Sequence, residues 1–464
     1  MSRLGREYGM RAGEDTDVGI GPTSSGELKI AIFHYGFFYS GGGEKLVLEE
    51  IRGLRALGHQ VDCYAPFVDR QGCFPDVPEM EEIRTLLPSP PPWLPMKDPL
   101  WVTLCCLLIP FMAPRFREYD ILVGANQPGP WLVFALSRVL RKPYVTYLAQ
   151  PLRLLHPREI DLENGIRIRE GDHHFLMALK RLAGWFINWA DRISVTNASI
   201  TLTNGDHVAR WIKQVYGTES RTCPAGCHPA PECDLDYDSR WKGSISAGGH
   251  VVRKPYILLT NRHSPMKRFE YALWAIKAIA KRAPRIRLVI TGQETEYTEQ
   301  LRYLARGLRI EDRVAFVGLV PEDELRSLYL NAALYVYPSP EEDFGMGIVE
   351  AMAAGTPVVA WGNGGPTVTV DDRETGFLVT PYDTDKFAER MLQLVSSPAL
   401  AERMGRAGHR RAAEFFSYDH HNHFLAQALL DAMADRGEAQ AVSHVSIPAA
   451  NWAREEIEVA GRER

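Results

Sequence analysis

Short apolar runs alternate with amphipathic segments along most of the chain, and this alternation limits the folds open to it. The run KIAIF has the β-branched, apolar character of a buried parallel strand, and the glycine loop SGGGE follows shortly after it. From Glu44 onward, apolar residues recur at helical spacing until Gly58, which caps the helix before the strand-like QVDCYAP. This order of strand, glycine loop, helix and strand predicts the start of a doubly wound parallel sheet.

The same alternation continues in two blocks. Residues 229–253 separate them, and their Pro, Asp, Ser and Gly content predicts a linker. We therefore expect an α/β fold with two Rossmann-like domains, at residues 28–245 and 250–410, that face each other across a cleft. In the first block, strands are expected at YDILVGA, PYVTYLA, ISVT and ITLT, and helices at PWLVFALSRVLR, LMALKRLAGWFINWADR and GDHVARWIKQVYG. In the second block, strands are expected at YILLTNR, IRLVITG, VAFVG and LYVYPS, and helices at RFEYALWAIKAIAKR, TEQLRYLARGL and EDELRSLYLNA.

Composition and charge narrow the classes of partner. The chain of 464 residues, 45% hydrophobic and 24% charged, has the make-up of a soluble globular protein of two domains. Its formal net charge of −5 gives no general attraction for polyanions, so no nucleic-acid partner is expected. Seven scattered cysteines, an odd number, indicate no disulfide framework and favour a reducing, cytoplasmic location.

The two ends and one apolar segment bear on location. Residues 1–27 lack the apolar core of a signal peptide and are expected to be a disordered lead-in, and residues 434–464 a polar tail. The nearest candidate for a membrane span, LWVTLCCLLIPFM at 100–112, falls short of the roughly 18 apolar residues required. It is interpreted either as a buried helix of the first domain or as a surface that dips into a bilayer.

Two groups of potential metal ligands are present, and neither has the spacing of a standard site. One lies in CPAGCHPAPEC, and the other on the final helix, which is expected to begin at Ser417 as its N-cap. We expect a proline-rich surface loop and a solvated helix rather than zinc sites. The residues are Cys223, Cys227, His228 and Cys233 in the loop, and His420, His421 and His423 on the helix.

The stretch EEDFGMGIVEAMAAGTPVVAWGNGGP, at residues 341–366, carries the main chemical signal. Gly345 and Gly347 at the expected helix start let a ligand approach the backbone, where free N–H groups and the helix dipole favour a phosphate. Glu342 and Glu350 bracket this turn, and carboxylates accept hydrogen bonds from hydroxyl groups. A ligand with phosphates in the middle and hydroxyls at both ends, such as a nucleotide sugar, satisfies both features.

Positive charge for a diphosphate is expected from another loop. Arg262 and Lys267 lie in TNRHSPMKRFE, directly after the first strand of the second block, where both can reach a phosphate. The glycine loop at Gly41, Gly42 and Gly43 adds backbone N–H groups from across the cleft. The absence of a G-x-G-x-x-G pattern argues against a dinucleotide-dependent oxidoreductase.

As a set, these motifs resemble the GT-B retaining glycosyltransferases of the large group 1 family (family 4). The resemblance covers most of residues 28–433 in layout and is strongest from Tyr256 to Val379. It implies that the final helix, residues 411–433, crosses back onto the first domain. The motifs are GGGE at 41–44, NRHSPMKRFE at 261–270, VITGQ at 289–293, VAFVGLVPEDELRSLY at 314–329, and the E-x7-E pair with EAMAAGTPVVA and GNGGP after it.

The resemblance also implies a role for each site residue. Arg262 and Lys267 would bind the donor diphosphate, Glu342 would hold hydroxyls of the donor sugar, and these three are the expected catalytic residues. Glu350 would hold the ribose. Further donor contacts would come from Gly42, Gly43, Gly318, Phe344, Gly345, Met346 and Gly347.

Two positions depart from the family pattern. Many members carry a histidine in the loop that reads YLAQPLRLLH here, at the place of Ala149 or Gln150. Val368 stands where many members have a glutamate, which weakens the case for donor contacts from GGPTVTV. The polar residues available on the acceptor side are Gln150, Arg153 and His156.

The reaction implied is transfer of a hexose, of mannose, glucose or N-acetylglucosamine type, from a GDP- or UDP-linked donor with retention. The acceptor would be a glycan, a lipid-linked molecule or a small molecule. Side-chain cations would stand in for a metal, so no metal or other cofactor is expected, and the D-x-D match DTD at 383–385 is remote from the other motifs. The alternative is a non-catalytic nucleotide-sugar-binding protein of the same fold, against which the intact set of two cations and two carboxylates argues.

The first domain also carries residues suited to a membrane surface. PPPWLPMKDPLWVTLCCLLIPFMAPRFR precedes the basic, aromatic RKPYVTYLAQPLRLLHPRE, and both fall in the domain that handles the acceptor in this fold. A membrane-anchored acceptor, approached from the cytosolic face, is therefore expected. The interface residues would be Trp93, Trp101 and Phe111, with Arg115, Arg117, Arg141 and Lys142 meeting lipid phosphates.

Overall fold

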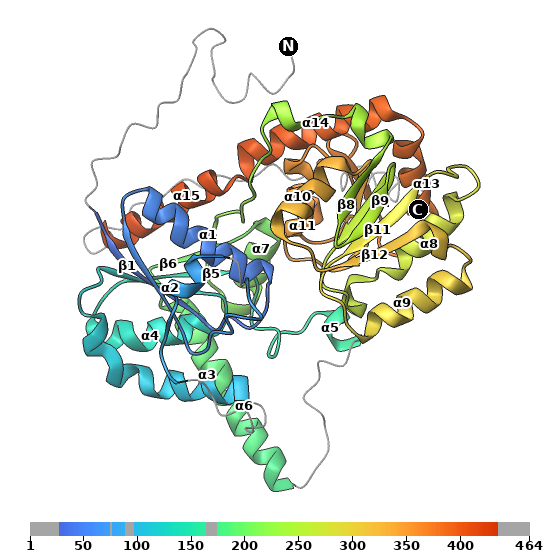
Figure 1. The fold of residues 1–464 in the computed structure, drawn as a ribbon. Helices are drawn as coiled ribbons and strands as arrows, with labels where there is room; N and C mark the ends of the chain where they lie inside the picture. The colour runs from blue at the N-terminus through green and yellow to red at the C-terminus, as the bar shows by residue number, and fades with distance from the viewer. Residues whose placement is uncertain (1–26, 75–76, 89–96, 164–173, 435–464) are drawn as a thin grey trace, which may run out of the picture.

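The computed structural model describes residues 27–74, 77–88, 97–163 and 174–434. The expected polar tail, nearly all of the expected lead-in, and Trp93 lie outside the described residues. Two α/β lobes lie side by side, and the last two helices run across both of them (Figure 1).

The first domain is built on a seven-stranded parallel sheet with helices on both faces (Figure 1). The strand order is β3-β2-β1-β4-β5-β6-β7, so the direction of winding reverses between β1 and β4. In such sheets ligands bind at this reversal, outside the carboxyl ends of the strands. The strands are β1 (Lys29–His34), β2 (Gln60–Ala65), β3 (Arg84–Thr85), β4 (Ile121–Ala125), β5 (Tyr144–Leu148), β6 (Ile200–Thr203) and β7 (Arg221–Thr222). The helices are α1 (Gly42–Ala56), α2 (Glu79–Glu82), α3 (Lys97–Leu108), η2 (Ile109–Phe116), α4 (Gly129–Leu140), α5 (Glu159–Glu163), α6 (His174–Thr196) and α7 (Asp206–Tyr216).

The second domain repeats this design with six parallel strands in the order β12-β11-β10-β13-β14-β15. Its reversal lies between β10 and β13, and the two loops that carry the site motifs follow these two strands. The strands are β10 (Tyr256–Thr260), β11 (Arg287–Thr291), β12 (Val314–Gly318), β13 (Leu334–Tyr337), β14 (Val358–Trp361) and β15 (Gly376–Val379). The helices are η5 (Pro265–Lys267), α8 (Glu270–Ile279), α9 (Glu296–Gly307), η6 (Glu311–Arg313), α10 (Glu322–Asn331), α11 (Met346–Ala353), α12 (Pro366–Thr369) and α13 (Thr384–Val395).

The last two helices, α14 (Pro398–Phe415) and α15 (Tyr418–Ala434), join the domains. α14 packs on α11 of the second domain, and α15 packs on α1 of the first. Between them, Ser417 caps α15 by accepting a hydrogen bond from the backbone N–H of His420 at 3.2 Å. A Cβ on Gly53 of α1 would lie 1.8 Å from Nδ2 of Asn422, so only glycine permits this close packing. The expected return of the final helix to the first domain is confirmed.

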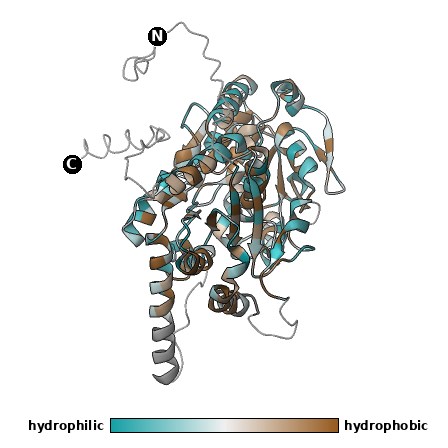
Figure 2. Cartoon of the chain, turned by 90° about the vertical axis from the view of Figure 1, so that its left-hand side faces the viewer, coloured by the Kyte–Doolittle hydropathy of each residue, from teal (hydrophilic) through white to brown (hydrophobic). Residues whose placement is uncertain are grey.

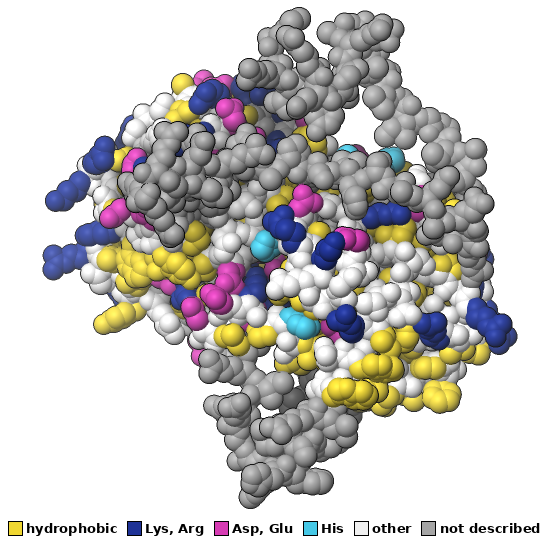
Figure 3. All heavy atoms as spheres, turned by 180° about the vertical axis from the view of Figure 1, so that it is seen from behind, with side chains coloured by type: hydrophobic (Ala, Val, Ile, Leu, Met, Phe, Trp, Pro, Cys, Tyr) yellow, Lys and Arg dark blue, Asp and Glu magenta, His cyan; other side chains and the backbone are white. Residues whose placement is uncertain are grey.

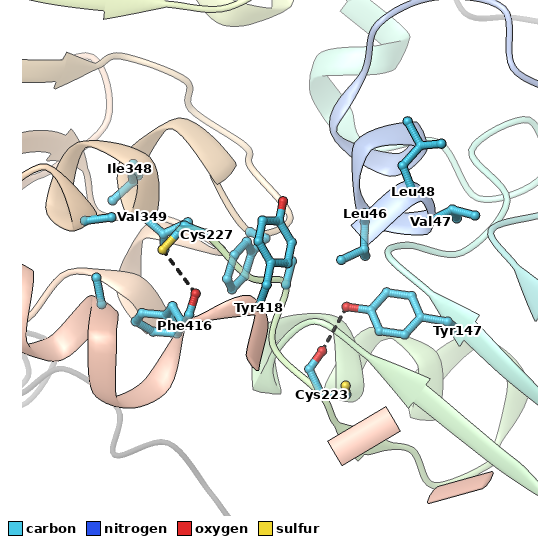
Figure 4. Close-up of a cluster of buried hydrophobic side chains, with 14 of the residues drawn as sticks. Leu46, Val47, Leu48, Tyr147, Cys223, Cys227, Ile348, Val349, Phe416 and Tyr418 are labelled. Carbon is cyan, nitrogen blue, oxygen red and sulfur yellow. Dashed lines mark hydrogen bonds between the residues drawn. The ribbon is translucent and has the colours of Figure 1, made fainter. Parts of the chain in front are cut away.

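One hydrophobic core is continuous through both domains (Figure 4). Leu46 and Tyr147 contribute from the first domain and Val349 from the second, while Phe416 and Tyr418 lie between them at the α14–α15 junction. The Tyr147 hydroxyl donates to the carbonyl of Cys223 at 2.8 Å. The site between the domains is therefore anchored on one side by a shared apolar core.

Two sequence-based assignments were wrong. ISVT was expected to be a strand, but it forms the end of α6, where Asp191, Ser194 and Val195 are buried at helical spacing. The expected linker contains an antiparallel hairpin of β8 (Ser244–Ala247) and β9 (His250–Arg253). The left-handed pair Gly248 and Gly249 forms its two-residue turn, a hairpin signal present in the sequence. The rest of the linker holds the short helices η3 (Glu232–Asp234) and η4 (Asp238–Trp241).

The apolar segment around residues 100–112 is buried on one side and exposed on the other. Cys105 and Ile109 are buried against the first-domain core, whereas Leu107 is 60% exposed and Phe111 is 82% exposed. Trp101, one of the expected interface residues, is partly buried against the core and donates its Nε1–H to the carbonyl of Pro88 at 2.7 Å. Within the described residues, no helix combines the length and apolar character that crossing a membrane requires.

Candidate active site

Two helix N-termini face each other across the cleft between the domains. α1 begins at Gly42 after β1, and α11 begins at Met346 after β13. A Cβ on Gly42 would lie 3.2 Å from Cγ of Met346, so the two helix starts nearly touch. The first N–H groups of a helix have no intrahelical partner, and two such ends suit an anionic ligand.

Glu342 and Lys267 form an ion pair beside the start of α11. Nζ of Lys267 lies 2.5 Å from Oε2 of Glu342, and the Tyr337 hydroxyl donates to the same oxygen at 2.7 Å. Burial alone raises the pKa of Glu342, but the charge of Lys267 and the hydrogen bonds from Lys267 and Tyr337 lower it by more, to about 2. Glu342 is therefore a carboxylate at neutral pH, held in one orientation with its charge balanced by Lys267.

Arg262 is the exposed cation of the same loop. Its guanidinium carbon lies 5.9 Å from the ring centroid of Tyr39, which belongs to the glycine loop segment of the first domain. A cation over an aromatic face is held by the ring quadrupole and keeps its donors available. The structure thus brings Arg262 and Lys267 to the cleft on one loop of the second domain, with Arg262 against Tyr39 of the first domain.

Glu350 lies on α11, one turn into the helix. Its Oε1 lies 3.0 Å from Nζ of Lys45, a residue of α1 in the first domain. Its Oε2 accepts a hydrogen bond from the hydroxyl of Tyr329 at 2.9 Å, and that hydroxyl lies 2.8 Å from Oγ1 of Thr260. Both oxygens of Glu350 therefore have partners, one from each domain.

Glycines keep the start of α11 open and fix the loop before it. Gly345 adopts a left-handed conformation with φ of 90°, and a Cβ on Gly347 would lie 2.3 Å from the Tyr335 hydroxyl. In GNGGP, a Cβ on Gly364 would lie 2.2 Å from the carbonyl oxygen of Glu342, and Gly365 N–H donates to that oxygen at 2.6 Å. The second glycine motif therefore positions Glu342 through its backbone.

The remaining donor candidates lie in different surroundings. The ring of Phe344 is buried and packs edge-on against Phe416 with centroids 5.8 Å apart, so only its backbone faces a ligand. Gly43 faces Asn126, whose Nδ2 lies 3.0 Å from where a Cβ would be. Gly318 ends β12, at the edge of the sheet and two strands away from β10, and its carbonyl accepts from Gly292. The structure does not bring Gly318 next to the E-x7-E pair.

On the acceptor side, the structure brings two of the three candidates to the cleft. Arg153 donates to Gln150 and to Oδ2 of Asp343, the latter at 2.8 Å. His156 instead lies against Tyr216 of α7, with ring centroids 6.0 Å apart. Its Nε2 is buried, and burial lowers the pKa of the imidazole. Gln150 and Arg153 are therefore the candidates that approach the loop of Glu342.

The position that often holds a glutamate in the family is closed to a ligand. Val368 is 6% exposed, and its methyl groups lie 3.6 and 3.9 Å from where a Cβ on Gly205 would be. Its carbonyl accepts a hydrogen bond from Arg411 of α14 at 3.0 Å. This loop has a packing role in the chain.

A second set of contacts between the domains was not predicted from the sequence. Arg158 of the first domain donates to the carbonyl of Glu341 at 3.0 Å and lies 3.3 Å from Oδ2 of Asp343. Asp161 is fully buried, and its Oδ2 lies 3.2 Å from Nε of Arg158, so this ion pair orients the guanidinium. A signal was present, because the loop with Arg153 and Arg158 follows β5 and Asp343 follows β13, and the carboxyl ends of both strands border the cleft.

The two groups of potential metal ligands agree only in part with the expected surface loop and solvated helix, since His228, Cys233 and His423 are exposed. Cys223, Cys227 and His421 are buried beneath the α14–α15 junction, not on a surface loop or a solvated helix face. Sγ of Cys223 lies 3.4 Å from Nδ1 of His421, whose Nε2 lies 3.3 Å from Glu50. The described residues contain no group of three or more His, Cys, Asp or Glu arranged to hold a metal ion. In the DTD match, Asp383 caps α13 by accepting from the N–H of Lys386 at 2.8 Å.

Comparison with known protein families identifies both halves of the chain. The family described as glycosyl transferases group 1 matches residues 244–411, and the family described as Glycosyltransferase Family 4 matches residues 40–228. The mouse protein Alpha-1,3/1,6-mannosyltransferase ALG2 is 25% identical over 405 residues, 82% of this chain and 90% of its own. The D-inositol 3-phosphate glycosyltransferase of Acidothermus cellulolyticus is 28% identical over 422 residues, 86% of this chain and 88% of its own.

Solved structures share the fold over nearly the whole described chain. The crystal structure of Anabaena Alr3699/HepE in complex with UDP superposes with a TM-score of 0.66 at 18% identity and covers 87% of this chain and 100% of that one. The two parallel sheets, the cleft and the returning helix are thus those of a GT-B protein. The chain belongs to the group 1 glycosyltransferases, family 4, with the GT-B fold.

Proposed function

We propose that the protein transfers a hexose from a GDP- or UDP-linked donor to a glycan, lipid-linked or small-molecule acceptor, with retention of configuration and without a metal ion. The observation that carries this proposal is the Lys267–Glu342 ion pair. Glu342 lies just before α11, and Lys267 lies on the loop after β10 that also carries Arg262. One cleft thereby offers cations for a diphosphate and an ionised carboxylate for sugar hydroxyls.

In this proposal each part of the donor has its own part of the site, argued from the contacts described above. The diphosphate would lie between the starts of α1 and α11, where Arg262 and Lys267 reach it. The sugar would lie toward Glu342, whose orientation Tyr337 and the backbone of Gly365 fix. The ribose would lie toward Glu350, deeper along α11. The relatives named above act as a mannosyltransferase and a D-inositol 3-phosphate glycosyltransferase, which supports a hexose as the group transferred.

The reaction would proceed by displacement on one face of the sugar. The bond between the anomeric carbon and the diphosphate oxygen breaks while the acceptor oxygen bonds to the same face of that carbon. The acceptor proton passes to the departing diphosphate. Lys267, Arg262 and the N–H groups of α11 stabilise the negative charge that develops on the leaving group, and such preorganised stabilisation is the largest contribution in many enzymes.

The non-catalytic alternative predicts binding of the same donor without turnover. Such a protein would need fewer of the site residues than an enzyme does, because a binding protein does not need cations placed against a leaving group. All four charged residues are present, and each contacts a specific partner: Arg262 the ring of Tyr39, Lys267 and Glu342 each other, and Glu350 the hydroxyl of Tyr329. Measured turnover distinguishes the two functions.

The function is tested by incubating the purified protein with a panel of GDP- and UDP-linked hexoses in excess EDTA. We expect one donor to release its nucleoside diphosphate in preference to the others, at a rate that EDTA does not change, because Arg262, Lys267 and backbone N–H groups meet the diphosphate charge. The sugar released first, observed by proton NMR before mutarotation, should keep the donor's anomeric configuration. Loss of activity in EDTA that Mn²⁺ restores would overturn the metal-free mechanism, and no turnover of any donor would favour the binding protein.

We also propose that the first domain contacts a membrane where the acceptor resides. Exposed apolar side chains gather on the face formed by α3, η2, α4 and α6, and Figure 3 shows hydrophobic side chains on this part of the molecule with basic ones beside them. A hollow of about 430 Å³ between η2 and α4 joins Phe111 and Val139 to Arg117. The projecting helix α6 carries further apolar residues (Figure 2). The exposed set is Leu107, Phe111, Val139, Trp185, Phe186 and Trp189.

Of the basic residues expected to meet lipid phosphates, one has another role. Nζ of Lys142 donates to the backbone carbonyls of Arg117 and Tyr119, so Lys142 ties α4 to η2. Arg115 and Arg117 remain exposed at the rim of the apolar face. Exposed aromatic residues beside arginines suit the interface of an anionic bilayer.

Flotation with phosphatidylglycerol vesicles tests this contact. The protein should float at low salt and less at high salt, because salt screens surface attraction. Phe111→Ser should reduce flotation without lowering thermal stability, since the side chain is 82% exposed. Tyr303→Ser, on α9 of the second domain and 74% exposed, is the matched control and should float as the unaltered protein does. Protein that stays in the bottom fraction at low salt, or equal flotation of the two variants, would contradict the proposal.

A further inference from the structure

Lys45 is a first-domain residue that reaches into the second domain. It lies in the first turn of α1, directly after the glycine loop. Its Nζ lies 3.0 Å from Oε1 of Glu350 on α11 and 2.7 Å from Oε1 of Glu322 at the start of α10. The side chains of Lys45 and Glu350 are 18% and 19% exposed, whereas that of Glu322 is 67% exposed. The inner pair is therefore shielded from water and the outer pair is not.

In the shielded pair of Lys45 and Glu350, each charge stabilises the other. Burial alone lowers the pKa of the Lys45 ammonium, but the charges of Glu350 and Glu322 raise it well above its usual value. A buried ammonium without a carboxylate partner is strongly unfavourable, and so is the reverse. Lys45 and Glu350 thus favour the arrangement in which the two domains are close.

The same contact determines where Glu350 points. Tyr329 holds Oε2 from within the second domain, and Lys45 holds Oε1 from the first. A carboxylate oxygen accepts more than one hydrogen bond, so a ribose hydroxyl can donate to Glu350 while both partners stay in place. Without Lys45, Oε1 of Glu350 loses the ion-pair partner that the first domain provides.

We propose that Lys45 is a further donor-site residue, which orients Glu350 for the ribose hydroxyls and couples donor binding to closure of the cleft. The proposal rests on the assignment of Glu350 to the ribose in the proposed function. Lys45 acts on the ribose through Glu350, so it is a positioning residue. Its neighbours in the chain, Gly42 and Gly43, border the diphosphate position, so closure at Lys45 also brings the start of α1 onto the donor.

The test compares binding of UDP and GDP with binding of their 2′,3′-dideoxy analogues by calorimetry. Lys45→Met should weaken binding of whichever ribonucleotide the protein prefers by about 10- to 100-fold, as expected for loss of a hydrogen bond to a charged group. It should weaken binding of the dideoxy analogue much less, because that analogue offers no hydroxyls to Glu350. Lys45→Arg should restore much of the affinity. Glu322→Gln, which removes the exposed partner of the same ammonium, should bind both ligands as the unaltered protein does.

The outcomes separate this proposal from the one on which it rests. Equal affinity of Lys45→Met and the unaltered protein for the ribonucleotide would overturn the role of Lys45 alone. An equal loss for the ribonucleotide and the dideoxy analogue, with a lower melting temperature, would assign Lys45 a purely structural role and overturn it too. If the unaltered protein binds neither UDP nor GDP, the proposed function fails, and the assignment of Lys45 fails with it.

Discussion

Replacement of Lys267 by alanine should lower turnover by about 10²- to 10³-fold, the usual cost of removing one group that stabilises charge in a transition state. The ammonium lies 2.5 Å from Glu342, the carboxylate proposed to hold the sugar, and on the same loop as Arg262, which is proposed to bind the diphosphate. The variant should also bind nucleoside diphosphates more weakly. Initial rates of donor consumption and calorimetric affinities measure the two effects.

Lys267→Ala also removes the ion-pair partner of Glu342, so a control variant has to keep the positive charge. The pKa of Glu342 is about 2, below its usual 4.5, so the pair contributes stability above pH 4.5 that is lost as the pH falls toward 2. Lys267→Ala removes that contribution and leaves a buried carboxylate. Lys267→Arg keeps the charge and should retain more activity than alanine. An alanine variant that is folded and turns over at the unaltered rate would show that Lys267 does not meet the diphosphate.

Most of the architecture was predictable because parallel strands that are buried on both faces have continuous apolar sequences. KIAIF and YILLT became β1 and β10, the first strands of the two sheets, and the glycine loop SGGGE follows β1 as expected. ISVT was misassigned because its β-branched content favours a strand locally, while burial of Asp191, Ser194 and Val195 on one helix face decided the outcome. Tertiary packing overrode local preference there.

The site was predictable in its members but not in its pairings. The rule that ligands bind at the carboxyl ends of strands placed Arg262, Lys267 and Glu342 together. It did not give the pair of Lys267 with Glu342, nor Tyr337 beneath them, because these depend on how two loops 75 residues apart fold against each other. Contacts between the domains, such as Lys45 with Glu350, depend further on how the cleft closes, which no local pattern encodes.

Replacement of Glu342 by glutamine should lower turnover by about 10²-fold or more and leave affinity for the free nucleoside diphosphate nearly unchanged. The amide keeps the shape of the carboxylate but loses the charge that strengthens hydrogen bonds from sugar hydroxyls. Since the role proposed for Glu342 is to hold the sugar and not the diphosphate, only ligands that carry the sugar should be affected. Lys267→Ala, in contrast, should weaken binding of both kinds of ligand.

The neighbouring carboxylate provides the matched control. Glu341 precedes Glu342, is partly exposed, and accepts from the backbone N–H of Ile160 at 3.4 Å. Glu341→Gln should therefore keep the activity of the unaltered protein, which separates the role of Glu342 from a general effect of charge in this loop. If Glu342→Gln weakens binding of the nucleoside diphosphate and of the intact donor by the same factor, Glu342 acts through the position of Lys267 and not on the sugar. Equal activity of both variants would remove Glu342 from the site altogether.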